Sequence, residues 1–514
     1  MKNCCPKCDY ELKKESKFCT SCGYKLNTFE AISTMNLSVS ENSIDDEIAL
    51  SRFRFVNWLD FIQYQQFSNI EAEQAFKILY YCFIFLSDLF NNSDDFIKNR
   101  FKDEHTQILE QIPEKLCGVK ENEIPNVVKF LKRRLFKNNV DYRWLFIAEI
   151  VYTYKFLNIE FNNSNSDYNR LWNFLGITKE KKINLILSCI KNPAIIKNKK
   201  IRKSFIDIEK FVASQHKYLT QKVFNIAVCA NMSAGKSTFV NALLGADYLP
   251  SRNEATTACI TSVYDNDLQT KMIGFVTSKD EILEISDNLL LENIDKWNSY
   301  GNNTHIYLQS DLDDISSNQV ICAVHDTPGT NNSGDKTHHD ITMNFLNSTK
   351  LAAIVFVVNA EHVSTTDEKT LLSEIYTNKI CRDKTPIIFV LNKADCIDNE
   401  KEDIFELISK YKDYLNDIGF ENPKILPVSA KAARLLKMAS KRKSNNFSKM
   451  EQREFALCLS EFLEDYDFSS NDGVFETSDS IISIGQKEYS RNEILTALNR
   501  TGINAIEKEI ESLF

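Results

Sequence analysis

The sequence predicts a multidomain protein that combines an α/β domain, built on a doubly wound and mostly parallel sheet, with an all-helical domain and a small zinc ribbon. Three observations lead to this prediction. A loop with the spacing of a phosphate-binding motif joins an apolar run to an apolar helix at residues 223–244. Aromatic and aliphatic residues recur at helical spacing over residues 47–220. Two Cys-x-x-Cys pairs open the chain.

The first 26 residues have the cysteine spacing of a structural zinc site. The thiolates of Cys5, Cys8, Cys19 and Cys22 suit tetrahedral Zn²⁺. So short a segment needs a metal to fold, which favours a zinc ribbon over unpaired thiols; Cys4 is a spare or a substitute for Cys5. The segment resembles the zinc ribbons that open many bacterial proteins. A tetrathiolate centre offsets its lysine excess, so we expect a protein contact and see no strong nucleic-acid signal.

Residues 27–45 are rich in Ser, Asn and Thr, which is typical of a linker. Residues 46–200 are predicted to form the helical domain, and residues 201–220 a helix that enters the first strand of the α/β domain. Basic and bulky apolar residues mix at 129–137 and 195–205, as in helices that bind membrane surfaces. A solvated helix face is the favoured interpretation of both segments.

The phosphate-binding motif occupies residues 230–237, between a predicted buried strand at 223–229 and a predicted helix at 238–244. Such a loop directs backbone N–H groups and the positive end of the helix dipole at one point, which suits phosphates. We expect Lys236 to reach the β- and γ-phosphates and the Ser237 hydroxyl to bind Mg²⁺. Ala230 replaces the usual first glycine. The residues expected to contact the nucleotide here are Asn231, Ala234, Gly235, Lys236, Ser237 and Thr238.

Four further motifs follow in order, each next to a predicted strand at the edge where open α/β sheets bind ligands. Their residues are Thr256 and Thr257 before strand 259–264; Asp326 to Gly329 after strand 320–324; Asn392 to Asp395 after strand 386–391; and Ser429, Ala430 and Lys431 after strand 425–428. Five motifs in this order predict GTP binding with Mg²⁺.

Each motif has a distinct chemical task. Asp326 is expected to hold the Mg²⁺ shell and the Gly329 N–H to meet the γ-phosphate. Either Thr256 or Thr257 can ligate Mg²⁺ and orient water, and we favour Thr257. On the base side, Asp395 can accept two hydrogen bonds from guanine, Asn392 and the Ala430 N–H read the remaining polar edge, and the Lys393 stem covers the ring. The base-side residues are Asn392, Lys393, Asp395, Ser429, Ala430 and Lys431.

The wording of residues 233–245, together with Tyr248-Leu-Pro250 and Ala255-Thr-Thr-Ala258, resembles the bacterial branch of the dynamin family. The resemblance covers about residues 221–514. It implies that Ser233 helps to hold a monovalent cation such as K⁺, which supplies the charge that an arginine finger brings elsewhere. The residues expected to act in catalysis are Lys236, Ser233, Thr257 and Gly329. Met232 replaces a polar residue of the family, which places fast intrinsic turnover in doubt.

Residues 493–514 form a predicted helical segment with a Thr-Gly-Ile break and an apolar stripe. The resemblance implies a GTPase domain over residues 201–514, with neck helices at 201–220 and 493–514 packed together. The family's stalk and membrane paddle have no counterpart in this sequence, and the N-terminal helices or a second chain are the expected substitutes. Residues 469–490 are polar, and we expect a loop there.

Three histidines lie near the predicted site. His325, next to Asp326, has the position of a general base, but the end of a buried strand favours a structural side chain. His338 and His339 fall in a predicted switch region at 331–340, where a metal role has little support.

The 514 residues include 43% hydrophobic and 26% charged side chains, which suits a globular protein of three units. A net charge of −9 disfavours general affinity for nucleic acid. The cysteines outside the ribbon fit a reducing cytoplasm, and the most apolar run, 78–86, is far shorter than the ~20 residues of a membrane span. We expect a cytoplasmic protein, and the resemblance adds peripheral contact with the inner face of the membrane.

Two classes of function remain. The first is a dynamin-like GTPase that dimerises through its G domains, hydrolyses GTP faster when assembled and works at a membrane, alone or with a second dynamin-like chain. The second is a slow GTP-binding switch that a partner reads and that the zinc ribbon recruits. Ser233 and its neighbours favour the first class, whereas Met232, Ala230 and the missing paddle favour the second.

Overall fold

The computed structural model describes residues 179–197 and most of the chain from 221 onward. The stretches outside the description after residue 221 are 232, 251–258, 267–270, 279–280, 287–288, 302–303, 313–319, 330–335, 398–402, 442–446 and 470–479. Elsewhere it describes single positions, namely 46, 49, 50, 53, 57, 151, 168, 169, 172, 173, 199, 202, 203, 206, 207, 210 and 211. The predicted zinc ribbon, the linker, nearly all of the helical domain, Met232, Thr256 and Thr257 therefore lie outside the described residues.

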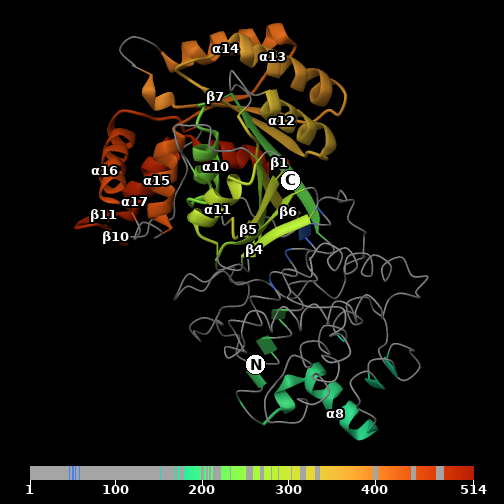
Figure 1. Cartoon of the computed structure of the whole chain (residues 1–514). Coiled ribbons are helices and arrows are strands. Elements are labelled where there is room, and N and C mark those ends of the chain that lie inside the picture. Colours follow the sequence, from blue (N-terminus) through green and yellow to red (C-terminus); the bar gives the residue numbers. More distant parts are fainter. Residues whose placement is uncertain are drawn as a thin grey trace. The chain divides into compact units, whose positions relative to one another are not determined.

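A sheet of nine described strands forms the centre of the α/β domain (Figure 1). The strands are β1 (Lys222–Ala230), β2 (Ile260–Asp265), β3 (Ile273–Ser278), β4 (Glu281–Ser286), β5 (Thr304–Ser310), β6 (Val320–Asp326), β7 (Ala353–Asn359), β8 (Ile387–Asn392) and β9 (Ile425–Val428). Their order across the sheet is β4-β3-β5-β2-β6-β1-β7-β8-β9. The predicted strands at 223–229, 259–264, 320–324, 386–391 and 425–428 are confirmed, within two residues at each end.

The sheet is mostly parallel, as predicted. β1 runs parallel to its neighbours β6 and β7, and the parallel pairing continues through β8 to β9. β2 and β5 are also parallel to each other, whereas the β2–β6, β3–β5 and β3–β4 pairs are antiparallel. The carboxyl ends of β1, β6, β8 and β9 consequently meet at one edge of the sheet, where four of the five motifs lie.

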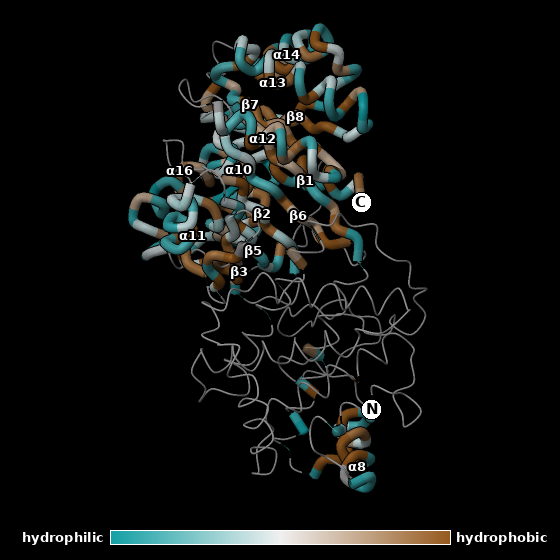
Figure 2. Tube along the Cα trace, turned by 45° about the vertical axis from the view of Figure 1, so that its right-hand side comes forward, coloured by the Kyte–Doolittle hydropathy of each residue, from teal (hydrophilic) through white to brown (hydrophobic). Residues whose placement is uncertain are grey.

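Helices cover both faces of this sheet. Alternate residues of β1 enter two different cores: Ile226 and Val228 join one, and Ala227 and Cys229 join the other. Such alternation is the side-chain period of a strand that is buried on both faces. The doubly wound architecture is therefore present, and most buried strand residues are apolar (Figure 2), although Asn225, Ser262 and His325 are buried polar exceptions.

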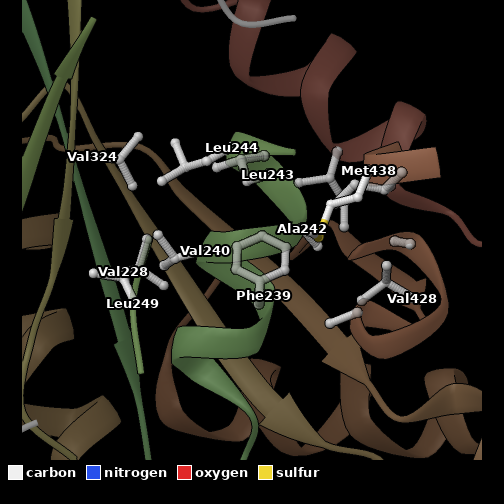
Figure 3. Packing of buried hydrophobic residues seen from close by; sticks show 14 of the residues in the cluster. Val228, Phe239, Val240, Ala242, Leu243, Leu244, Leu249, Val324, Val428 and Met438 are labelled. Atoms are coloured by element: carbon white, nitrogen blue, oxygen red, sulfur yellow. The ribbon is translucent and has the colours of Figure 1, made fainter. Parts of the chain in front are cut away.

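The two cores involve different helices. On one face lie α10 (Lys236–Leu244), α11 (Leu291–Asn298), α15 (Ala430–Ser440), α16 (Lys449–Glu464), α17 (Arg491–Arg500) and α18 (Ile503–Glu511). On the other lie α12 (Lys336–Ser348), α13 (Thr366–Ile375) and α14 (Ile404–Ile418). Figure 3 shows Phe239 and Val240 of α10 in the first core, beside Val228 of β1. Helix α8 (Glu180–Lys191) belongs to the upstream part of the chain.

The loop expected over residues 469–490 is wrong in its second half. Residues 481–490 form a hairpin of β10 (Ile481–Ile484) and β11 (Lys487–Ser490). Ile482 and Ile484 are buried while Ile481 is exposed, so the segment has the two-residue alternation of a half-buried strand. The polar average of the whole stretch concealed this short pattern.

The C-terminal helical segment is confirmed, with its break in the predicted place. Helix α17 ends at Arg500, and α18 begins at Ile503 after Thr501 and Gly502. The neck pairing expected between residues 201–220 and 501–514 stays a prediction, because most of the first segment lies outside the described residues. Among the described residues, no helix has both the length and the apolar composition needed to cross a bilayer.

The second core contains a buried acid. Glu368 of α13 is 2% exposed, and its carboxylate accepts a hydrogen bond of 2.8 Å from the Tyr411 hydroxyl of α14. Burial raises the pKa of Glu368 from its usual 4.5 to about 7, despite the hydrogen bonds that favour the charged form. Ionisation of this side chain therefore opposes folding above the unfolded-state value.

We expect Glu368→Gln to stabilise the protein at pH 8 but not at pH 4.5. The folded protein holds the proton of Glu368 more tightly than the unfolded chain, so stability is lost as the pH rises from 4.5 to about 7. That rise in pKa corresponds to about 3 kcal/mol, and this value is the upper limit of the gain at pH 8. Urea unfolding at both pH values measures it. An equal change in unfolding free energy at both pH values would contradict the assignment.

Candidate functional site

The loop at residues 230–237 connects the end of β1 to α10, as predicted. Gly235 has φ +80° and immediately precedes the helix, and Ser233 also has a positive φ of 62°. A Cβ on Gly235 would lie 2.5 Å from Nδ2 of Asn392, which is closer than real Cβ contacts. Glycine is thus required both by the backbone conformation and by the approach of the β8 loop. The backbone here turns sharply toward the N-terminus of α10.

Three polar side chains converge at this turn. The Lys236 ammonium contacts Oδ1 of Asp326, and the Ser237 hydroxyl donates a 2.9 Å hydrogen bond to Oδ2 of the same carboxylate. Lys236 and Asp326 are both buried, at 7% and 1% exposure. Strand pairing explains the geometry, because Asp326 ends β6 in register with Val228 of the adjacent β1. A buried charge is tolerated only when it is paired, and each partner here satisfies the other.

This donor set fits a magnesium nucleotide. A hydroxyl and a carboxylate are hard oxygen ligands, and Mg²⁺ sites commonly use one or two protein oxygens together with phosphate oxygens. The ammonium of Lys236 sits beside them and can neutralise phosphate charge. Gly329 follows β6 at the same edge, three residues after Asp326. Asn231 contributes a buried side-chain oxygen that has no hydrogen-bond partner among the described residues.

Asn392 joins this loop to the base-side motif. Its Nδ2 donates to the Ala234 carbonyl at 2.8 Å, and its Oδ1 accepts from the Ala430 N–H at 3.0 Å. Asn392 is 2% exposed. The side chain of Asn392 and the Ala430 N–H thus contact each other, and their contacts with a base edge stay a prediction. Only β7 separates β8 from β1, so the loops after β1 and β8 are close enough for one side chain to connect them.

The remaining base-side residues lie in the same loops. Asp395 belongs to a short 3₁₀ turn after β8. Burial raises the pKa of its carboxyl above the usual value, and a hydrogen bond from the Ser429 hydroxyl offsets part of that rise. Ser429 caps α15 by accepting from the Ala432 N–H at 3.3 Å. Lys393 has a left-handed φ of 62° and its ammonium lies 3.8 Å from Glu361.

His325 is a structural side chain, as favoured by its position in the sequence. It is 2% exposed, and burial lowers its pKa to about 3, so the ring is neutral. Nε2 lies 2.9 Å from Oδ1 of Asn225 and Nδ1 lies 2.7 Å from the Ser262 hydroxyl. The Asn225 oxygen can only accept, so Nε2 carries the proton and Nδ1 accepts from Ser262. Both nitrogens are occupied within the sheet, which excludes a general-base role in this arrangement.

The other two histidines do not form a metal site within the described part of the chain. His339 lies 3.1 Å from Glu374 of α13, and His338 is buried. Among the described residues, no three or more His, Cys, Asp or Glu side chains are grouped so that they could hold a metal ion. The zinc ligands Cys5, Cys8, Cys19 and Cys22 fall outside those residues.

Two contacts of the base-side loop were not predicted from the sequence. The Lys431 ammonium pairs with Glu454 of α16 at 2.7 Å, and the Ser429 N–H donates to the Thr501 carbonyl at 3.1 Å. Both partners come from the C-terminal helices. The Thr-Gly-Ile break marked the junction that contains Thr501, but no local pattern in the sequence named its partner.

Comparison with known proteins agrees with the motifs. Residues 226–394 match the sequence model of the dynamin family, a range that begins in β1 and ends at Ala394. The similarity to the dynamin family therefore covers this range, which includes the loop at residues 230–237 and the motifs that begin at Asp326 and Asn392.

Two kinds of relative were found. An uncharacterized protein from the 3′ region of xynA in Caldicellulosiruptor sp. (strain Rt8B.4) is 31% identical over 231 residues, which cover 44% of this chain. The chain spans about half, 54%, of the length of that relative. Among solved structures, an oligomerised bacterial dynamin pair, described as sensing and tethering membranes, aligns over 80% of this chain and 60% of its own, with 16% identity and a TM-score of 0.34. Aquifex aeolicus Era bound to GDP·AlF₄⁻ aligns over 40% of this chain and 51% of its own, with 21% identity and a TM-score of 0.24.

We expect Gly235→Ala to weaken guanine-nucleotide binding by roughly tenfold or more. The new Cβ would displace Asn392 and strain a left-handed backbone, costs that together reach about 1–3 kcal/mol. Titration with a fluorescent GDP analogue measures the dissociation constant. Gly301→Ala is the matched control, because Gly301 has a positive φ of 103° but open space around its Cβ position. Equal affinities for the two variants would contradict the close approach of Asn392.

Proposed function

We propose that this chain is a dynamin-like GTPase that binds GTP with Mg²⁺, hydrolyses it to GDP and phosphate, and does so faster when its G domains dimerise or assemble. The observation that carries the proposal is the convergence of Lys236, Ser237 and Asp326 at the start of α10. The dynamin-family match over residues 226–394 supports the same conclusion independently of that geometry.

On the phosphate side, we assign Lys236 to the β- and γ-phosphates and Ser237, Asp326 and Thr257 to Mg²⁺. The bound ion would neutralise charge on the phosphate oxygens. The Lys236–Asp326 contact supports these roles, because an incoming phosphate can replace the carboxylate as the partner of the ammonium. The Gly329 N–H is assigned to the γ-phosphate, and Ser233 to a monovalent cation such as K⁺.

On the base side, we assign Asp395 to the two N–H donors of guanine and the Lys393 stem to the ring face. The loop of Ser429, Ala430 and Lys431 borders the remaining edge. The Ser429 hydroxyl supports the Asp395 assignment, since its hydrogen bond to the carboxyl offsets part of the rise in pKa that burial causes. Asn392 holds this loop at a fixed distance from the phosphate-binding loop.

The more detailed proposals rest on the sequence. We propose a homodimer through the G domains, with a second dynamin-like chain as a candidate partner. We also propose a cytoplasmic location with peripheral contact at the inner face of the membrane, and a Zn²⁺ ribbon over residues 1–26. The alternative function is a slow GTP-binding switch that is recruited through the ribbon. Met232 favours this alternative, because a thioether cannot position the attacking water as a polar side chain does.

Turnover per molecule decides between the two functions. An assembly-stimulated enzyme should show GTP turnover that rises with protein concentration in K⁺ buffer and rises further on anionic liposomes. Lys236→Ala should lower turnover by roughly a hundredfold, because it removes the charge nearest the transferred phosphate. Phosphate release measures both. Turnover that is slow and independent of protein concentration, together with tight GTP binding, would instead support the switch.

Base preference tests Asp395. We expect Asp395→Asn to weaken GTP binding and to favour xanthosine triphosphate by about tenfold or more, since the amide donates where the carboxylate accepted. Competition titrations of both nucleotides measure the preference. Glu361→Gln is the matched control, because Glu361 is a neighbouring acid that acts on Asp395 only through its charge. An unchanged base preference in Asp395→Asn would rule out the assigned contact.

A further inference from the structure

The α17–α18 junction is built against the loop that the proposed function assigns to guanine. We infer that Thr501 and Gly502 position this loop, residues 429–431, so that the C-terminal helix pair sets guanine affinity separately from phosphate chemistry. The inference rests on the proposed function. It concerns positioning residues, since neither is assigned a contact with the nucleotide.

The first contact is a backbone hydrogen bond between distant parts of the chain. The Ser429 N–H donates to the Thr501 carbonyl at 3.1 Å, and the two residues are 1% and 0% exposed. Thr501 is itself fixed by the end of α17. Its N–H donates to the Ala497 carbonyl at 3.1 Å, and its hydroxyl donates to the Leu498 carbonyl at 2.6 Å. The carbonyl that holds Ser429 therefore has a defined position, set by the last turn of α17.

The second contact requires glycine. Gly502 has φ +88° and ψ −9°, a left-handed conformation that other residues seldom adopt. A Cβ on Gly502 would lie 2.2 Å from the carbonyl oxygen of Pro427 and 3.2 Å from Cβ of Phe468. The first neighbour is backbone of β9 and cannot rotate away as a side chain could. Pro427 lies two residues before Ser429, so any substitution at Gly502 must push β9 and its loop away from the junction.

The displaced loop is connected to the rest of the site through named hydrogen bonds. The Ala430 N–H donates to Asn392, which in turn donates to the Ala234 carbonyl in the phosphate-binding loop. The Asp395 carboxylate accepts a hydrogen bond from the Ser429 hydroxyl. A shift of residues 429–431 therefore disturbs Asp395, the residue assigned to guanine, before it disturbs the phosphate-binding residues. Lys236 and Asp326 lie on α10 and β6 rather than on this loop.

A further contact connects α18 to α10, the helix that follows the phosphate-binding loop. The buried Lys437 of α15 donates to the Leu243 carbonyl near the end of α10 at 2.8 Å and pairs with Glu507 of α18. A cation at a helix C-terminus is favourably placed, because it meets unpaired carbonyls. Helix α18 is thus held in register with the nucleotide site at its start, through Gly502, and at its middle, through Glu507. This second contact holds α17 and α18 in place, while Thr501 and Gly502 position residues 429–431.

The test is Gly502→Ala, compared with Gly485→Ala. Gly485 also has a positive φ, 63°, and its Cβ would lie 2.4 Å from a side-chain oxygen of Gln452, but it belongs to the β10–β11 turn. Both variants thus place a Cβ on a residue with positive φ, but only the one at Gly502 meets the backbone of β9. Dissociation constants for GDP, GTP and ATP, the number of binding sites per molecule, and KM and kcat for GTP are measured on the full-length protein. We expect Gly502→Ala to weaken GDP and GTP alike by roughly tenfold or more and to raise KM with kcat nearly unchanged. Weak ATP binding should stay the same, so that the preference for GTP over ATP falls.

Other outcomes overturn the inference. Unchanged dissociation constants in folded Gly502→Ala would overturn it. Fewer binding sites per molecule with normal affinity would also overturn it, because in both cases the junction supports folding without positioning the loop. An equal loss of affinity in Gly485→Ala would show that strain anywhere in the module suffices.

If Gly502→Ala does not fold, Arg500→Ala replaces it. Arg500 donates 2.7 Å and 3.4 Å hydrogen bonds to the Leu463 and Phe462 carbonyls, and its loss should raise the GDP dissociation constant by about threefold. No change in that variant would also overturn the inference. Absence of GTP binding by the unaltered protein would refute the proposed function itself.

Discussion

The contact between Lys236 and Asp326 is the interaction on which the arrangement of the site depends. Both charges are buried, and a buried charge left without its partner costs about 3–5 kcal/mol. The pair therefore fixes the spacing between the start of α10 and the end of β6, and the Ser237 hydroxyl strengthens it. A ligand that binds here has to offer the ammonium an anion and the carboxylate a cation at the same time. A magnesium-bound phosphate meets both requirements, whereas a bare anion or a bare cation meets one.

The phosphate and base halves of the site are supported by different elements. β1, β6 and α10 hold the phosphate half, and their positions follow from parallel strand pairing in the centre of the sheet. The base half lies on β8 and β9, toward the sheet edge, where β9 has only four residues and three of them are half-buried. A short edge strand supplies little packing of its own. The C-terminal helices provide the missing support through Thr501 and Gly502, which explains why residues so late in the chain contact the base-side loop.

The sequence predicted the parts of this structure that depend on local pattern. Apolar runs marked five strands, and the motifs marked the loops that follow them, because a buried parallel strand and a phosphate-binding turn both leave a signature within about ten residues. Asn392 shows what this approach does not reach. Its residue type suggested a base contact, which stays a prediction, whereas its contacts with Ala234 and Ala430 depend on how far apart β1, β8 and β9 lie in the sheet. The Ser429–Thr501 bond escaped prediction for the same reason, since it depends on packing between distant segments, whereas the polar average of residues 469–490 concealed the local pattern of the β10–β11 hairpin.

His325 shows how the phosphate half connects to the upstream chain. Its ring is held between Ser262 and Asn225, and the Asn225 amide donates to Asp46 at 2.9 Å. Phe53 packs against Phe275 and Tyr264, with ring centroids 5.0 and 5.4 Å away. A neutral, doubly hydrogen-bonded histidine next to Asp326 cannot change partners without leaving a buried polar group unpaired. The residue that resembles a general base in sequence thereby acts as a rigid connection between the sheet and the segment that precedes it.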